Sequence, residues 1–262
     1  MQKIIINGCC GKMGTILQRV IAESGTAEVA AGIDPAFENP AAGASGFAFP
    51  CFSFPGQCHT AADCVIDFSS PAALPALLDW CVSRDLPLVT ATTGISGQDR
   101  TALLAAAEQI PVFRSSNFSL GINLMTHLVS KAASVLEQEF NVEIIEKHHN
   151  QKKDSPSGTA FLLADAVNRG CQEKKNLLFG RHGKHDECRL TDMGIHAIRG
   201  GSISGEHTVL FAGSGETIEI THRALSKEIF AAGALAAALW VSPQAPGLYS
   251  MDDMLDGLCS KQ

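Results

Sequence analysis

Short apolar runs alternate with amphipathic segments over the first half of the chain. Residues 3–7 form a run of the kind found in a strand buried on both faces. Apolar residues then recur at helical spacing over residues 13–21, and Gly25 is a typical helix end. The alternation continues with strands predicted at residues 28–33, 64–69, 86–91 and 111–114 and helices at 71–84 and 97–109. This pattern predicts an α/β domain with a parallel sheet.

The second half of the chain has a different pattern. A helix is predicted over residues 122–138 and a strand over residues 141–146. Glycine-rich turns then separate three β-like runs, at residues 194–199, 206–212 and 216–222. Turns at such short spacing indicate antiparallel or mixed strands. We therefore expect a second, α+β domain, an open mixed sheet with a helix over it and one face free to pair with another subunit.

The remaining segments are predicted as follows. Residues 35–60 show little periodicity and are interpreted as a loop with one short strand, and the polar residues 171–192 as an exposed loop. An alanine-rich helix is expected at residues 229–241. A last short helix, at residues 250–258, is expected to pack on the first domain.

A glycine-rich turn joins the first strand to the first helix. Gly8, Gly11 and Gly14 follow the spacing G-x-x-G-x-x-G, and Asp34 ends the second strand twenty positions further on. Glycines let the backbone approach a pyrophosphate, which the amides at the helix N-terminus would bind. An acidic residue at this distance binds a ribose hydroxyl in dinucleotide-binding folds. The alternative is a tight turn without a ligand.

The same residues bear on which dinucleotide is bound. The carboxylate of Asp34 favours the free 2′-hydroxyl of NAD and repels the 2′-phosphate of NADP. Pro35 follows where an arginine would accommodate that phosphate, although Lys12 offers one positive charge. We therefore expect NADH, with NADPH also possible.

Small polar residues follow two further predicted strands. They are Thr92-Thr93-Gly94 and Ser115-Ser116-Asn117-Phe118. Ligands bind beyond the carboxyl ends of the strands in open α/β sheets, so both segments are expected at the cofactor cleft. The alternative is ordinary turn chemistry.

Titratable residues are concentrated in the stretch at residues 146–160. His148 and His149 are adjacent, so in an extended chain they point to opposite sides, and Lys152 follows closely. Ser155 fits a helix N-cap and Pro156 the first helical position, which would leave the amides of residues 157–159 unpaired. Such a helix start binds a carboxylate, and His or Lys can act as a general acid.

Two alternative interpretations apply to this stretch. The histidines form a metal-ligand pair only with a third ligand, for which His182 and His185 are loosely placed, and the lysines could be a solvated pair. Nine cysteines occur without a Cys-x-x-Cys pair, so we interpret them as reduced thiols that act as small core residues. No metal is expected.

Composition excludes several classes. The 262 residues are 45% hydrophobic and 18% charged, as in a globular protein with a sizeable core, and the net charge of −7 argues against nucleic-acid binding. No signal-peptide pattern begins the sequence, and no apolar run is long enough to cross a bilayer. A soluble, cytoplasmic protein is expected.

The central stretch resembles the signature of the dihydrodipicolinate reductase family, E-x-H-H-x-x-K-x-D-x-P-S-G-T-A. The turn at residues 8–14 is similar to that family's G-x-x-G-[RK]-M-G, and further matches occur at residues 92–94, 117–119, 205–208 and 219–222. The resemblance implies NAD(P)H-dependent reduction of a cyclic dicarboxylate, 4-hydroxy-tetrahydrodipicolinate, in diaminopimelate and lysine synthesis. It implies a Rossmann-type domain at residues 1–119 and 228–262, and an inserted substrate-binding and oligomerisation domain at residues 120–227. It also implies a homotetramer, which we expect to form through the second-domain sheet.

The resemblance also implies roles for individual residues. His148 would be the catalytic acid/base and Lys152 the proton donor, with His149, Gly158 and Thr159 contacting substrate. The predicted cofactor contacts are Gly8, Cys9, Cys10, Gly11, Lys12, Met13, Gly14, Asp34, Ala91, Thr92, Thr93, Ser115, Ser116, Asn117 and Phe118.

The sequence departs from the family pattern at a few positions. Cys9 and Cys10 occupy variable turn positions that in the family usually hold Ala or Ser together with Gly. Ala91 stands where glycine is common. Asn150-Gln151 replaces a more basic pair found in some members. Pro35 replaces an arginine of some members, which puts NADP use in doubt.

Two rival hypotheses are a nucleotide sensor without turnover and a related reductase for another small acid.

Overall fold

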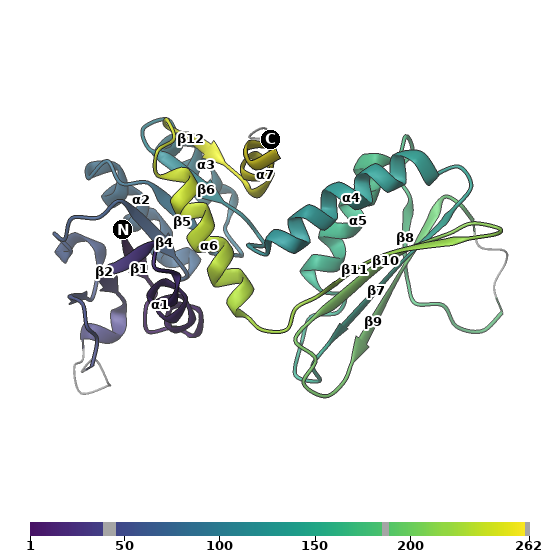
Figure 1. Cartoon of the computed structure of the whole chain (residues 1–262), viewed down its shortest axis with the longest axis horizontal. Helices are drawn as coiled ribbons and strands as arrows, with labels where there is room; N and C mark the ends of the chain where they lie inside the picture. Colours follow the sequence, from purple (N-terminus) through teal and green to yellow (C-terminus); the bar gives the residue numbers. More distant parts are fainter. Residues whose placement is uncertain (39–45, 185–188, 260–262) are drawn as a thin grey trace. The chain divides into compact units, whose positions relative to one another are not determined.

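A computed structural model describes residues 1–38, 46–184 and 189–259 (Figure 1). The two predicted loops at 35–60 and 171–192 therefore each lie partly outside the described residues, and so does the candidate metal ligand His185. The chain divides into two compact units. Unit 1 comprises Met1–Ser119 and Lys227–Gln262, and unit 2 comprises Leu120–Ser226.

Unit 1 is built on a seven-stranded sheet in the order β12-β6-β5-β4-β1-β2-β3, with every neighbouring pair parallel. The strands are β1 (Gln2–Asn7), β2 (Ala27–Ile33), β3 (Cys51–Phe52), β4 (Cys64–Asp67), β5 (Leu88–Thr90), β6 (Pro111–Arg114) and β12 (Gly247–Tyr249). The predicted Rossmann-type parallel sheet is thus confirmed. The edge strand β12 was not predicted, because its three residues carry no periodic signal.

Helices cover both faces of this sheet. They are α1 (Lys12–Ser24), α2 (Leu74–Ser83), α3 (Gly97–Ala107), α6 (Glu228–Val241) and α7 (Met251–Cys259). Alternate residues of β1 point to opposite faces: Ile4 and Ile6 pack with α1 and α6, while Ile5 packs with α2 and α3. The predicted helix at 71–84 begins as a 3₁₀ turn, Pro71–Ala73.

Unit 2 contains a mixed five-stranded sheet in the order β11-β10-β7-β9-β8. Its elements are α4 (Leu120–Leu136), β7 (Asn141–His148), α5 (Gly158–Gly170), β8 (Asn176–Phe179), β9 (Asp192–Arg199), β10 (Glu206–Ala212) and β11 (Thr217–Arg223). The predicted second domain with an open mixed sheet is confirmed. The prediction of a loop throughout 171–192 was wrong, because Asn176–Phe179 pairs with β9 as an exposed edge strand.

Side chains of β7 alternate strictly between the two faces of the unit 2 sheet. Val142 and Ile144 are buried in the core that α4 and α5 cover, and Glu146 and His148 continue this buried row. Strand β7 also reaches His148, two residues beyond the predicted end at 146. One face of the sheet therefore carries polar, titratable groups at the end of an otherwise apolar row.

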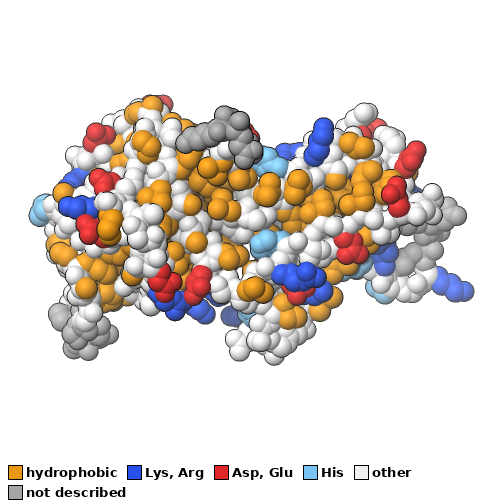
Figure 2. Space-filling view, viewed as in Figure 1, with side chains coloured by type: hydrophobic (Ala, Val, Ile, Leu, Met, Phe, Trp, Pro, Cys, Tyr) orange, Lys and Arg blue, Asp and Glu red, His pale blue; other side chains and the backbone are white. Residues whose placement is uncertain are grey.

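The surface of α4 carries apolar side chains, including Leu124 and Leu128, each 50% exposed (Figure 2). Among the described helices, none is long and apolar enough to span a membrane.

Candidate active site

The glycine-rich turn of unit 1 is closely packed against its own backbone. Gly8 has φ +80°, and its amide donates to the carbonyl of Ile33 at 2.8 Å. A Cβ at Gly8 would lie 2.7 Å from the carbonyl oxygen of Phe68, and a Cβ at Gly14 would lie 2.2 Å from that of Gly8. Only glycine fits both positions, so the turn presents backbone rather than side chains.

The start of α1 and the carboxylate of Asp34 lie at this turn. Gly11 is the N-cap of α1 and caps no amide through a side chain, so the first helical amides retain their capacity to bind an anion. Asp34 Oδ2 accepts from the amide of Cys10 and Oδ1 from that of Ala36, both at 3.0 Å. Each carboxylate oxygen keeps a second lone pair for a hydroxyl group. These groups fit the phosphate and ribose of a dinucleotide.

Thr92 is buried and belongs to a network around the carboxylate of Asp67. Both oxygens of Asp67, which is fully buried, accept hydrogen bonds: Asn7 and Ser69 donate to Oδ1, while Thr90 and Thr92 donate to Oδ2. The network joins the ends of three neighbouring strands. This network holds in place the segment that contains half-buried Ala91 and exposed Thr93. Polar residues at the strand ends were the only sign of the network in the sequence.

The segment after β6 forms its own turn. Ser115 Oγ accepts from the amide of Asn117 at 3.1 Å, and Asn117 Oδ1 accepts from the amide of Ser119 at 2.9 Å. Ser116 is exposed, whereas Phe118 as a whole residue is 3% exposed and packs against Phe113. The Phe118 carbonyl also lies close against Gly233 of α6, so Phe118 belongs to the core of unit 1.

Burial raises the pKa of the cysteine thiols near the turn. This applies to Cys9, which is fully buried, and also to Cys10 and Cys51. The described cysteines Cys9, Cys10, Cys51, Cys58, Cys64, Cys81 and Cys171 are free thiols. The raised pKa keeps Cys9, Cys10 and Cys51 as protonated thiols at neutral pH. The interpretation of the cysteines as core residues holds for buried Cys9 but not for Cys10, which is exposed.

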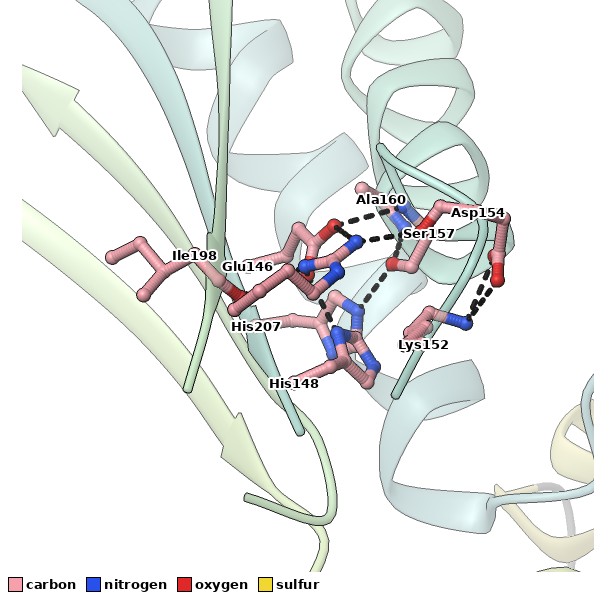
Figure 3. A network of polar contacts seen from close by, with 9 residues as sticks. Glu146, His148, Lys152, Asp154, Ser157, Ala160, Ile198 and His207 are labelled. Carbon is pink, nitrogen blue, oxygen red and sulfur yellow. Dashed lines mark hydrogen bonds and ion pairs between the residues drawn. The ribbon is translucent and has the colours of Figure 1, made fainter. Parts of the chain in front are cut away.

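In unit 2, Glu146 is the centre of a polar network (Figure 3). Its carboxylate is fully buried and accepts hydrogen bonds from His148 Nδ1 at 2.6 Å and from the amide of Ser157 at 3.0 Å. Arg199 adds a bidentate pair, with both guanidinium contacts at 2.7 Å. A buried carboxylate is stable only when fully hydrogen-bonded, so Glu146 stays ionised and fixed.

The strand register explains how these residues meet. On β9, Arg199 pairs in parallel with His148, and on β10, His207 lies opposite Glu146. All four residues therefore lie on the buried face of one sheet. Arg199 also donates to the carbonyl of Asp154 at 2.7 Å, which ties the segment before α5 to the sheet.

The pKa values of the network follow from these contacts. Burial by itself would raise the pKa of Glu146, but the hydrogen bonds from Arg199 and His148 outweigh it and the pKa is lowered. Burial lowers the pKa of His148, against the opposing effect of Glu146. The carboxylate accepts the Nδ1 proton of His148, which leaves Nε2 of the neutral ring as a proton acceptor.

His207 and Ser157 extend the network. Ser157 Oγ lies 2.8 Å from His207 Nε2, and the rings of His148 and His207 meet edge to face at 5.1 Å. Burial lowers the pKa of His207 to about 4, so this ring is neutral at neutral pH. Arg199 and His207 received no role from the sequence. The sequence feature that pointed to a residue such as Arg199 was Glu146 in the buried row of β7, because a buried carboxylate requires a cationic partner.

The predicted cap of α5 was wrong. The N-cap is Ser157, whose hydroxyl accepts from the amide of Ala160 at 3.2 Å, and the helix begins at Gly158 rather than at Pro156. The Ser157 amide, expected to be unpaired, is held by Glu146. This bond draws residue 157 toward the sheet, so the chain becomes helical only after it.

The other predicted substrate contacts lie around this helix start. Gly158 is exposed, and a Cβ there would meet nothing within 4 Å, so a ligand can reach its backbone. Thr159 and His149 are half-buried. Lys152 Nζ pairs with Asp154 Oδ2 at 2.8 Å (Figure 3). Among the described residues, a group of three metal-ligand side chains forms at Cys9, Cys10 and Asp34, and His148 and His149 join no such group.

The fold and these sites define the chain as an oxidoreductase of the Rossmann class, with an acid–base network on a second sheet. The family models of dihydrodipicolinate reductase match it, the N-terminal model at residues 2–118 and the C-terminal model at residues 121–255. The chain therefore belongs to the dihydrodipicolinate reductase family. Membership of this family implies a nicotinamide cofactor.

Individual relatives agree with this assignment. The chain is 45% identical to the 4-hydroxy-tetrahydrodipicolinate reductase of Caldanaerobacter subterraneus subsp. tengcongensis, over 97% of this chain and 98% of that one. It is 43% identical to the enzyme of the same name from Clostridium tetani, with 98% of each covered. A solved structure of dipicolinate-bound dihydrodipicolinate reductase from Paenisporosarcina sp. TG-14 has the same fold, with a TM-score of 0.80 at 23% identity, over 95% of this chain and 97% of that one.

Proposed function

We propose that the protein reduces 4-hydroxy-tetrahydrodipicolinate to tetrahydrodipicolinate, with NAD(P)H as reductant, in the diaminopimelate route to lysine. The observation that carries this proposal is the network of Glu146, His148 and Arg199 beside the start of α5. It presents an oriented imidazole next to a helix start that binds carboxylates, within a chain whose relatives carry this activity in their names.

The residues of unit 2 divide between proton transfer and binding. His148 is the acid/base, because its Nδ1 is fixed by Glu146 and its Nε2 is free to exchange a proton. Lys152 is the proton donor to the substrate carbon. His149, Gly158 and Thr159 bind the substrate, with the amides of the α5 start and the basic side chains stabilising its two carboxylates.

A bound nicotinamide dinucleotide would supply the hydride. The turn of Gly8 to Gly14 would hold its pyrophosphate and Asp34 the ribose that carries the 2′ position, while the segments at residues 91–93 and 115–118 would line its cleft. We propose a preference for NADH, because the Asp34 carboxylate accepts from a free 2′-hydroxyl and repels a 2′-phosphate. Exposed Lys12 allows some use of NADPH. A strong kinetic preference for NADPH would contradict this interpretation.

Unit 1 is accordingly the dinucleotide-binding domain and unit 2 the substrate-binding and oligomerisation domain. We propose a homotetramer assembled through the face of the unit 2 sheet opposite α4 and α5. That face carries ordered ion pairs, Glu143 with Arg181 and His196, and Lys147 with Glu206. Multi-angle light scattering measures the assembly.

The central test is a coupled assay in which the substrate is generated in situ and NADH or NADPH oxidation is followed. Replacing His148 or Lys152 with Ala lowers kcat by roughly 10²–10⁴-fold, the usual contribution of an acid–base group. Lys153→Ala, an exposed neighbour, is the matched control and retains activity. Wild-type turnover in either site variant would refute the residue assignment. Binding of NADH without oxidation would favour a sensor, and oxidation only with other small acids would favour a related reductase.

A further inference from the structure

The dinucleotide turn contains a group of metal-binding side chains that takes no part in the proposed proton and hydride transfer. Cys9 Sγ, Cys10 Sγ and a carboxylate oxygen of Asp34 all lie within 4.8 Å of one another. Two sulfurs and one carboxylate are a donor set that soft or borderline divalent ions such as Zn²⁺ and Cd²⁺ favour. Ligands of a tetrahedral zinc site lie roughly 3.5–4 Å apart, because Zn–S bonds are about 2.3 Å, so the group needs to contract by at most about 1 Å.

The local fold brings these ligands together from two elements. Cys9 and Cys10 belong to the turn after β1, and Asp34 follows β2, the neighbouring strand. The Cys10 amide already holds Asp34 Oδ2 at 3.0 Å, so the carboxylate is fixed beside both thiols. The hydrogen bond from the Cys10 amide to Asp34 therefore both shapes the dinucleotide turn and holds the three metal-binding side chains together.

Gly32 leaves room for the innermost ligand. A Cβ on Gly32 would lie 2.7 Å from Cys9 Sγ, so any larger residue would displace that sulfur. Gly32 pairs with Cys51 of β3, which puts a third, half-buried thiol on the adjacent strand. Cys10 is exposed and Asp34 half-buried, so an ion can enter from the surface.

We propose that Cys9, Cys10 and Asp34 form a binding site for a thiophilic divalent metal ion, and that this ion and the dinucleotide exclude one another. Binding forms two metal–sulfur bonds and one metal–oxygen bond and releases the two thiol protons to solvent. Water or Cys51 completes the tetrahedron. The exclusion follows because Asp34 and the turn cannot bind the ribose and pyrophosphate while they bind the ion. This second part rests on the proposed dinucleotide site, whereas metal binding does not.

Cd²⁺ is the probe, since its thiolate complexes absorb in the ultraviolet. Titration of the full-length, reduced protein is expected to give one Cd²⁺ per chain with a thiolate-to-metal charge-transfer band. Cys10→Ser, at an exposed position, is expected to weaken this binding at least tenfold, and Asp34→Asn to weaken it less. Cys171→Ser, a half-buried thiol in unit 2, is the matched control and leaves binding unchanged.

The competition is measured separately, from NADH fluorescence at increasing Cd²⁺. The apparent Kd for NADH is expected to rise in proportion to free Cd²⁺ in the wild type and to respond far less in Cys10→Ser. Cd²⁺ binding that Cys10→Ser leaves intact would overturn the site, and unchanged NADH affinity with Cd²⁺ bound would overturn the exclusion. If the protein bound Cd²⁺ through Cys10 but did not bind NADH, only the proposed dinucleotide site would be contradicted and the metal site would stand.

Discussion

At the scale of single residues, Glu146 is a fully buried carboxylate that His148, Arg199 and the Ser157 amide hold in place. Its removal frees one nitrogen of His148 and leaves Arg199 without its bidentate partner. Glu146→Gln is expected to lower kcat by about 10–100-fold, the usual cost when a carboxylate that orients an imidazole is lost. Because Glu146 raises the pKa of His148, the limb of the pH–rate profile that reports His148 is expected to move to lower pH.

Glu143 provides the matched control for this prediction. It lies on the same strand, on the opposite face of the sheet, and pairs with Arg181 and His196. Glu143→Gln removes a comparable charge from a comparable set of partners and is expected to leave both kcat and the pH–rate profile unchanged. If the two variants behaved alike, Glu146 would have only a structural role.

His207 makes stability depend on pH. Its pKa is lowered from 6.5 to about 4 in the folded protein, so between these values the unfolded state binds more protons. The contribution of His207 to the free energy of unfolding is therefore constant above pH 6.5 and falls as the pH decreases toward 4. At about 1.4 kcal/mol per pKa unit, the total loss is roughly 3 kcal/mol. Urea unfolding across this window measures it. His207→Gln is expected to flatten the slope, and an unaltered slope would contradict the assignment.

Local sequence sufficed for some of these residues and failed for others. His148, Lys152 and Gly158 lie within one short stretch whose composition already indicated proton transfer and anion binding. Arg199 and His207 reach the same network from β9 and β10, and their positions depend on a strand register that is set by distant parts of the chain.

At the scale of elements, the start of α5 combines a cap with a ligand site. Ser157 holds the Ala160 amide and also contacts His207. Ser157→Ala is expected to lower stability by about 1–3 kcal/mol, for the lost cap and an unsatisfied imidazole, and to raise KM for the dicarboxylate. Ser96→Ala, which removes the equivalent cap of α3 in unit 1, is the control. It is expected to reduce thermal stability without changing KM for the dicarboxylate.

The long amphipathic helices and buried strands followed from their periodicity, while the short edge strands did not. β8 and β12 each have few residues and lie at an edge of a sheet. Their strand character comes from pairing with β9 and β6, which no local pattern reveals.

At the scale of the whole molecule, unit 1 is assembled from two separate stretches of chain. Residues 227–262 return to the N-terminal sheet, where α6 buries Leu235 and Val241, and α7 buries Met251 and Met254. The predicted packing of the last helix on the first domain is confirmed for this unit. The core of unit 1 therefore closes only once the end of the chain is present.

Deletion of residues 227–262 is expected to abolish NADH binding and the cooperative unfolding of unit 1. Four large buried side chains at about 1.5–3 kcal/mol each contribute roughly 6–12 kcal/mol, which is comparable with the entire stability of a typical domain, about 5–15 kcal/mol. Circular dichroism and NADH fluorescence measure the effect. NADH binding that survives the long deletion would mean that the N-terminal 119 residues close a core of their own, and α6 would then be a covering element and not part of the folding unit.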